Sequence, residues 1–219
     1  MTEQVAHKSI VSKALAMWRR EGTVRLLSLL WNRMAGIFYV RRSFYLLRRD
    51  ITGPVQITKA PGVEARLATE ADFPKLAELM YLTPAEVKAK VQSGCQCMLG
   101  LADGEIAGYS WINYEKYYIS DVDYEVVVPL GQAYFGPGFV HPHYRGRRVH
   151  SVILDNMCEK LRSEGIQVAL SSVNVSNYNS IKGLVRSSFY AIERIDYRKT
   201  LRRRQTTKVK LPTGFVMQS

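Results

Sequence analysis

The segment from Phe139 to Leu154 constrains the fold more than any other part of the chain. An apolar strand there runs into Pro142, which cannot continue the hydrogen bonding of a sheet, and then into a basic turn that contains Gly146. After the turn, apolar residues recur at helical spacing, at Val149, Val152, Ile153 and Met157. The segment therefore predicts a strand, a turn and a helix. Because the first-turn amides of a helix are free and lie at the positive end of its dipole, the turn suits an anion such as a pyrophosphate.

At these residues the sequence resembles the GCN5-related N-acetyltransferase (GNAT) superfamily, whose cofactor loop has the pattern Arg/Gln-x-x-Gly-x-Gly/Ala after a strand. Arg145 matches the first position of the pattern, and Gly146 keeps the common Tyr-Arg-Gly element. The two small positions fall on Arg148 and His150, so the chain departs from the pattern at both. The resemblance implies that the loop binds the pyrophosphate of acetyl-CoA or of another acyl-CoA.

The same resemblance assigns further residues to the cofactor. The strand backbone would hold the pantetheine arm, and an Asn-x-x-Ser pair after the next strand would contact the same arm. The residues assigned in this way are Phe139, Val140, Arg145, Gly146, Arg147, Arg148, Val149, His150, Asn177 and Ser180. A helix cap without any cofactor contact explains Ser180 equally well.

The order of elements over residues 63–197 agrees with this resemblance. Thr69 and Thr83 each precede an acidic residue at the third position, which predicts helices over 70–80 and 84–93. The Asp103-Gly104 pair between apolar runs predicts a hairpin. We expect an α/β (α+β) fold, with a mixed, mostly antiparallel central sheet flanked by helices.

In the family, two strands diverge around the cofactor and the thioester lies in the gap between them. The resemblance places these strands at 132–140 and 167–173. Gly136, Pro137 and Gly138 permit a bulge that would separate the strands, although a simple kink at a sheet edge fits them nearly as well.

Direct attack of an amine on a thioester requires a proton acceptor and a group that stabilises the leaving thiolate. The family often uses a Tyr at a position that is Leu184 here, so Tyr178 or Tyr190 would have to replace it. We expect Glu125 to be the base, with His141 as the second candidate. Other side chains considered for this role are Tyr114, Glu115, Asp121, Asp123 and His143. Each of these charged or polar groups also fits a solvated surface position.

Composition favours one core in a reducing compartment. The chain has 219 residues and 47% hydrophobic content, which suit one core rather than two full domains. Its three cysteines form no even framework and cannot supply four zinc ligands at a known spacing. We therefore expect a cytoplasmic protein without a metal site.

Charge is distributed unevenly along the chain. Residues 1–60 have a net charge of +8 and residues 198–219 of +7, whereas residues 61–197 have −3. An acidic core suits a cationic small-molecule amine as acceptor. The basic flanks favour an anionic membrane surface or an acyl carrier protein as partner. We do not expect nucleic acid as a partner, because no recognised reading motif accompanies the basic residues.

We expect three parts: a basic amphipathic helical extension over 1–60, a GNAT-like acyltransferase domain over 61–200 and a basic tail over 201–219. The extension reads as two helices broken at Gly22, the second reaching Val40. No uncharged run approaches the roughly 20 residues that span a bilayer, and no cleavable signal fits. The apolar stripe fits packing on the core or on a second copy in a homo-oligomer, and it also fits a peripheral position at the inner face of the membrane.

Three functions follow as hypotheses. The first is transfer of an acetyl group from acetyl-CoA to a primary amine of a small molecule, sugar or peptide. The second is the same reaction with a longer acyl group from CoA or from an acyl carrier protein. The third is a catalytically degenerate GNAT-like binding protein, because both small loop residues and the expected Tyr are replaced.

Overall fold

The computed structural model describes residues 39–201, 203–212 and 214–217. The chain divides into two compact units, one of 43–196 with 206–219 and the other of 1–42 with 197–205. The larger unit contains the predicted site. The predicted N-terminal helices, apart from their last residues, lie outside the described residues. Within the described ranges, no helix is both long and apolar enough to cross a membrane.

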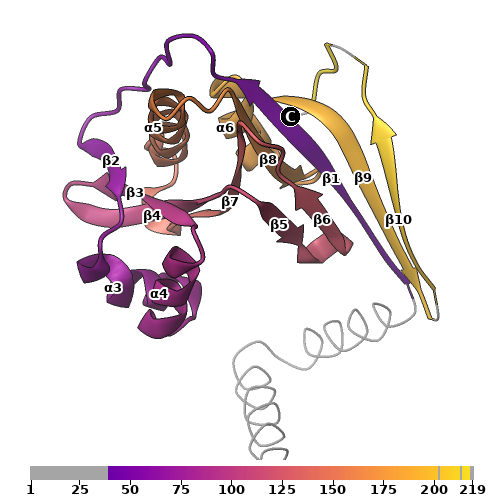
Figure 1. Ribbon diagram of the computed structural model, residues 1–219, viewed down its shortest axis with the longest axis horizontal. Coiled ribbons are helices and arrows are strands. Elements are labelled where there is room, and N and C mark those ends of the chain that lie inside the picture. The colour runs from indigo at the N-terminus through magenta and orange to yellow at the C-terminus, as the bar shows by residue number, and fades with distance from the viewer. Residues whose placement is uncertain (1–38, 202, 213, 218–219) are drawn as a thin grey trace, which may run out of the picture. The chain divides into compact units, whose positions relative to one another are not determined.

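The fold is built on an eight-stranded sheet with the strand order β10-β9-β1-β8-β7-β4-β3-β2 (Figure 1). The strands are β1 (Tyr39–Asp50), β2 (Val63–Leu67), β3 (Gln96–Ala102), β4 (Glu105–Asn113), β7 (Gln132–Val140), β8 (Val168–Asn174), β9 (Tyr190–Thr200) and β10 (Arg203–Lys210). Strand β8 pairs with β7 in parallel and with β1 in antiparallel orientation. The pairs β2–β3, β3–β4 and β4–β7 are antiparallel, so the predicted mixed, mostly antiparallel sheet is confirmed.

Helices cover both faces of the sheet. Figure 1 shows α3 (Phe73–Met80) and α4 (Pro84–Gln92) on one face, and α5 (Val149–Ser163) and α6 (Tyr178–Arg186) on the other. Strand β3 serves both faces because its side chains alternate. Met98 packs in the cluster that includes α5, whereas Cys97 and Leu99 pack in the cluster of α3 and α4. A separate hairpin of β5 (Lys116–Ile119) and β6 (Tyr124–Val127) precedes β7.

The local signals of the sequence act as predicted. Asp72 accepts hydrogen bonds from the backbone N and the hydroxyl of Thr69, at 2.8 and 2.9 Å. Thr83 and Glu86 exchange hydrogen bonds at the start of α4, where the Glu86 amide donates to the Thr83 hydroxyl at 3.3 Å. Asp103 and Gly104 have φ of 54° and 84°, the left-handed pair that a two-residue hairpin turn requires.

The boundaries of the flanks need correction. The predicted helical extension over 1–60 ran through residues 39–50, but these form β1, which pairs with β8 from Phe44 opposite Asn174 to Asp50 opposite Val168. A short apolar run such as Phe44–Leu47 has no periodicity of its own, so neighbouring strands decide its structure. The predicted tail over 201–219 likewise contains β10.

Candidate active site

Strands β7 and β8 pair over only part of their length. Their register runs from Gln132 opposite Val168 to Phe135 opposite Ser171, after which the two strands separate. Beyond that point β7 continues against β4, and β8 continues against β1. The separation leaves unpaired backbone on the facing edges of both strands, where the sequence predicted a gap.

A bulge in β7 lies at the start of this gap. Ser110 of β4 is opposite Gly138, but Ile112 is opposite Phe135, so β7 contains one extra residue in this stretch. The predicted bulge is therefore confirmed. The buried Asn113 stabilises it, because its Nδ2 donates to the carbonyl oxygens of Gly136 at 2.6 Å and Tyr134 at 3.3 Å.

A cavity of about 360 Å³ opens at the gap. Its wall includes small residues of the separating strands, among them Gly138 and Ser171, and residues of the two covering helices. Of the ten residues assigned to the cofactor, three line this cavity, namely His150, Asn177 and Ser180. Asn177 also caps α6 by accepting from the Ser180 amide at 3.2 Å, so the cap explains this pair as well as a ligand contact does.

His150 lies on the first turn of α5 and faces α6. Its Nδ1 would be only 2.9 Å from a Cβ placed on Gly183, so only a glycine leaves the imidazole this much room. Burial lowers the pKa of His150 to about 4, which keeps the ring neutral at neutral pH. Its side chain has no hydrogen-bond partner among the described residues. The departure from the small residue of the pattern thus places a neutral imidazole in the cavity wall.

Two residues of the loop have a left-handed backbone conformation. Arg148 has φ of 63°, a left-handed conformation that glycine adopts freely and other residues rarely do. Gly146 also has positive φ, at 83°, and nothing lies within 4 Å of the position of a Cβ. The amides of residues 146–150 donate to no backbone carbonyl in the described chain outside regular helix bonding. Free amides at a helix start are suited to an anion.

The side chains of the loop have different environments. Arg147 forms two hydrogen bonds with the Asp103 carboxylate, at 2.7 and 3.0 Å, which lower the pKa of Asp103 and tie the loop to the β3–β4 turn. Val149 is a core residue, with only 1% of its surface exposed. Arg145 is exposed and makes no ion pair within the described ranges, so it is available to a ligand.

Phe139 and Val140 lie beyond the cavity wall. They pair with Tyr109 and Gly108 of β4, and the Phe139 ring packs on Tyr109 at a centroid distance of 6.0 Å. Any contact that they make with a ligand must therefore come from the backbone edge that faces away from β4.

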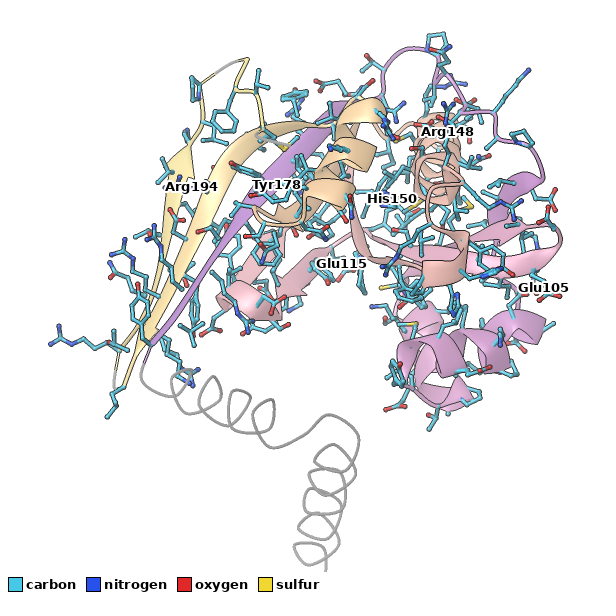
Figure 2. The ribbon with its side chains drawn as sticks, turned by 180° about the vertical axis from the view of Figure 1, so that it is seen from behind. Glu105, Glu115, Arg148, His150, Tyr178 and Arg194 are labelled. Carbon is cyan, nitrogen blue, oxygen red and sulfur yellow. The ribbon has the colours of Figure 1, made fainter. Side chains whose placement is uncertain are left out.

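The three residues predicted to be catalytic do not line the cavity. Glu125 is exposed on β6, and its carboxylate lies 3.4 Å from Lys116 Nζ. His141 uses its Nδ1 to accept from the His143 amide at 3.3 Å. Tyr178 is 54% exposed at the start of α6; Figure 2 labels it, together with Arg148 and His150 at the start of α5.

Other groups occupy the cavity instead. Asp121, one of the carboxylates considered as a base, lies in its wall because the short turn between β5 and β6 faces the gap. The Tyr117 ring stacks on Tyr134 at 4.5 Å and joins this hairpin to β7. Tyr134 is hydrogen-bonded to the Ser172 hydroxyl at 2.6 Å, and burial raises its pKa. Leu184, at the position of the expected Tyr, is buried and also lines the cavity.

Sequence reasoning missed Asn113 and Tyr134 because each reads as an ordinary residue of an apolar strand. The sequence offers no clear signal for either residue, since the contact of Asn113 with Gly136 depends on the pairing of β4 with β7. In the described part of the chain, no three His, Cys, Asp or Glu side chains gather closely enough to hold a metal ion.

By sequence, the chain matches neither a protein-family profile nor a curated protein. Its structure is similar to a GCN5-related N-acetyltransferase from Sphaerobacter thermophilus, with a TM-score of 0.59 and 17% identity over 84% of this chain and 58% of that one. A putative GNAT-family acetyltransferase from Novosphingobium aromaticivorans gives 0.53 and 17% over 79% and 66%. A GNAT-family acetyltransferase from Colwellia psychrerythraea gives 0.50 and 10% over 72% and 55%.

These solved structures agree with the resemblance of the loop. The described chain has the fold of the GCN5-related N-acetyltransferases. It spans between about half and two thirds of the length of these three chains.

Proposed function

We propose that the chain is an N-acyltransferase that transfers an acetyl group from acetyl-CoA to a primary amine of a small molecule, sugar or peptide. The observation that carries the proposal is the separation of β7 and β8 after Phe135 and Ser171, with a cavity at that point and a loop of free amides beside it. An unpaired strand edge suits the amides of a pantetheine arm, and a helix start suits a pyrophosphate. The residues present therefore fit an acyl-CoA.

Different parts of the site bind different parts of the acyl-CoA. The free edge of β7 near Gly138 forms strand-like hydrogen bonds with the arm, and Asn177 and Ser180 contact it from α6. The amides of residues 146–150 bind the pyrophosphate, and the exposed Arg145 adds a positive charge. When bound, the cofactor supplies an activated acyl thioester.

The amine attacks the thioester carbon directly, so a base must accept its proton. Asp121 is the carboxylate in the cavity wall, and we assign the role to it in place of Glu125, His141 or Tyr178. A carbon–nitrogen bond forms and the carbon–sulfur bond breaks. Since Leu184 has no proton to give, the proton taken from the amine is the one delivered to the leaving thiolate, which restores the base.

The donor and the partners belong to the same proposal. A longer acyl group, carried by CoA or by an acyl carrier protein, is the second form of the donor. The N-terminal residues 1–38 lie outside the described part. For them the sequence leaves two proposals: a peripheral contact of a cytoplasmic protein with the inner face of the membrane, or packing on the core or on a second copy.

A binding protein without catalysis is the second candidate function. Two observations favour it, namely the leucine at position 184, which removes the usual proton donor, and the imidazole of His150 in the cavity wall. Such a protein would bind CoA without consuming a thioester.

Release of free thiol from acetyl-CoA distinguishes the two functions. We expect release only when a panel of amines and amino sugars contains an acceptor, and a lower rate at low pH, where the amine is protonated. Asp121→Asn should slow release by about 10²-fold or more while CoA still binds. Glu125→Gln, the matched carboxylate variant, should change it little.

Two results would contradict this assignment. If CoA binds but no amine yields thiol, the chain is a binding protein. If Glu125→Gln slows release and Asp121→Asn does not, the base is Glu125, as the sequence first suggested.

A further inference from the structure

A second cavity, of about 850 Å³, lies between the end of β1, the segment 54–59, α5 and the C-terminal end of α6. Four cationic side chains border it: Arg49, Lys59, Arg148 and Arg186. Only two carboxylates do so, those of Asp50 and Asp155, which leaves a formal charge of +2 on these six groups. The cavity is therefore a basic one, and no residue of it except Arg148 was assigned to the cofactor.

Both carboxylates are already paired within the chain. Asp155 is buried and accepts from Arg49 Nη1 at 2.7 Å, from the Thr58 hydroxyl at 2.7 Å and from the Thr58 amide at 3.1 Å. Asp50 accepts from Arg48 at 2.6 Å and from the Tyr190 hydroxyl at 2.7 Å, and these hydrogen bonds lower its pKa. Neither carboxylate is therefore paired with Lys59, Arg148 or Arg186.

Three of the four cations have no such partner. Lys59, Arg148 and Arg186 make no ion pair within the residues that the structure describes. Positive charges that converge on a cavity without counter-charges repel one another, and this cost is recovered when an anion binds.

Ser187 gives a second and independent indication of a ligand. It borders the same cavity at the end of α6, is only 2% exposed, and its hydroxyl has no hydrogen-bond partner among the described residues. A buried hydroxyl without a partner is costly to the fold, so an acceptor that enters the cavity would satisfy it.

We infer that this cavity binds a phosphate monoester. The group has a charge near −2, which matches the surplus of the cavity, and its oxygens accept from guanidinium, ammonium and hydroxyl donors alike. Two sources share this chemistry, namely the ribose phosphate of CoA and a separate phosphate compound. The ribose phosphate as the source rests on the proposed function. It is favoured by Arg148, which is the N-cap residue of α5 and also borders this cavity. The second source does not depend on that function.

The test is a calorimetric titration of the full chain with inorganic phosphate, CoA and dephospho-CoA at constant ionic strength. Arg186→Gln is compared with Lys182→Gln, which removes the same charge from the same helix but does not border the cavity. We expect Arg186→Gln to weaken phosphate binding by about tenfold or more, and Lys182→Gln by less than about twofold. Arg148 is unsuitable as a probe because it also belongs to the loop.

The comparison of the two coenzymes identifies the source. If the wild type prefers CoA to dephospho-CoA by about tenfold and Arg186→Gln removes the preference, the ribose phosphate is the ligand. If phosphate binds but the two coenzymes bind equally, the ligand is a separate phosphate compound. Both results support the site.

Ser187→Ala adds a readout with two opposite effects. Removal of an unsatisfied hydroxyl should raise the midpoint of thermal unfolding without phosphate, while phosphate binding becomes weaker. The inference is overturned if the wild type binds no inorganic phosphate and does not distinguish the two coenzymes, or if Lys182→Gln weakens binding as much as Arg186→Gln. A failure of thiol release alone leaves the phosphate titration intact, so the two proposals fail separately.

Discussion

The gap cavity, between β7 and β8, is formed mainly by backbone geometry. The basic cavity, beside β1, is formed mainly by side chains. Backbone geometry makes the gap cavity, because two parallel strands separate and a bulge lengthens one of them. Side chains make the basic cavity, since its cations come from positions 49, 59, 148 and 186. The first kind of site follows from the strand topology. The second depends on the side chain at each of these positions.

The largest effect is expected for Asp155→Ala, which leaves Arg49 buried without its partner. Loss of one member of a buried ion pair should lower the free energy of unfolding by about 3 to 5 kcal/mol, measured by denaturant titration. The double variant Arg49→Met with Asp155→Leu should recover most of this loss. Asp103→Ala, which breaks the exposed pair with Arg147, should cost much less. Equal losses in the two single variants would mean that the Arg49–Asp155 pair beside the basic cavity stabilises the fold no more than an exposed ion pair does.

Acid should destabilise the folded protein through His150, which lines the gap cavity. Its pKa in the folded chain is about 4, below the usual value of about 6.5, so the unfolded state binds the proton first. The free energy of unfolding should therefore fall as the pH drops from about 6.5 to about 4, by roughly 2 to 3 kcal/mol from this group. His150→Gln should remove that part of the pH dependence. An unchanged slope in the variant would mean that the ring is not buried as described.

Asn113→Ala, at the bulge beside the gap cavity, should lower the free energy of unfolding by a smaller amount. It leaves the carbonyl oxygens of Gly136 and Tyr134 without their donor, which should cost about 2 kcal/mol of unfolding free energy. Asn156→Ala is the control, because its Nδ2 donates to the Val152 carbonyl on its own helix. If both variants lose the same small amount, Asn113 does not hold the bulge.

The smallest effect is expected at Arg148, which borders the basic cavity and is the N-cap residue of α5. Arg148→Gly should raise the unfolding free energy by up to about 1 kcal/mol, because glycine adopts positive φ without strain. Arg148→Ala, which removes the side chain but keeps the Cβ, should not be stabilising. A gain in the alanine variant equal to that in the glycine variant would assign the effect to charge rather than to the backbone.

Local signals allowed much of the fold to be predicted. The caps at Thr69 and Thr83, the Asp103-Gly104 turn and the loop at 145–150 each depend on a few adjacent residues, so the sequence contains all that determines them. The gap was predicted because the loop resembles a family in which these strands separate.

The other features depend on contacts between distant residues. Strand β1 is set by its pairing with β8, and no pattern within 39–50 indicates that partner. Asp121 rather than Glu125 reaches the cavity because of the way the β5–β6 hairpin meets Tyr134, which sequence spacing does not reveal. The basic cavity joins residues 49 and 186 only after folding, which is why no motif predicted it.

The central claim is that the free amides at 146–150 bind the pyrophosphate of CoA, and Gly146→Asp tests it most directly. This variant places a carboxylate at the loop, and Gly165→Asp is its control. Gly165 has nearly the same φ, 80° against 83°, with nothing within 4 Å of its Cβ position, but it follows the other end of α5. By calorimetry, Gly146→Asp should weaken CoA binding by about tenfold or more, or roughly 1.4 kcal/mol, while Gly165→Asp should bind like the wild type. Unchanged CoA affinity in a folded Gly146→Asp variant would contradict the account.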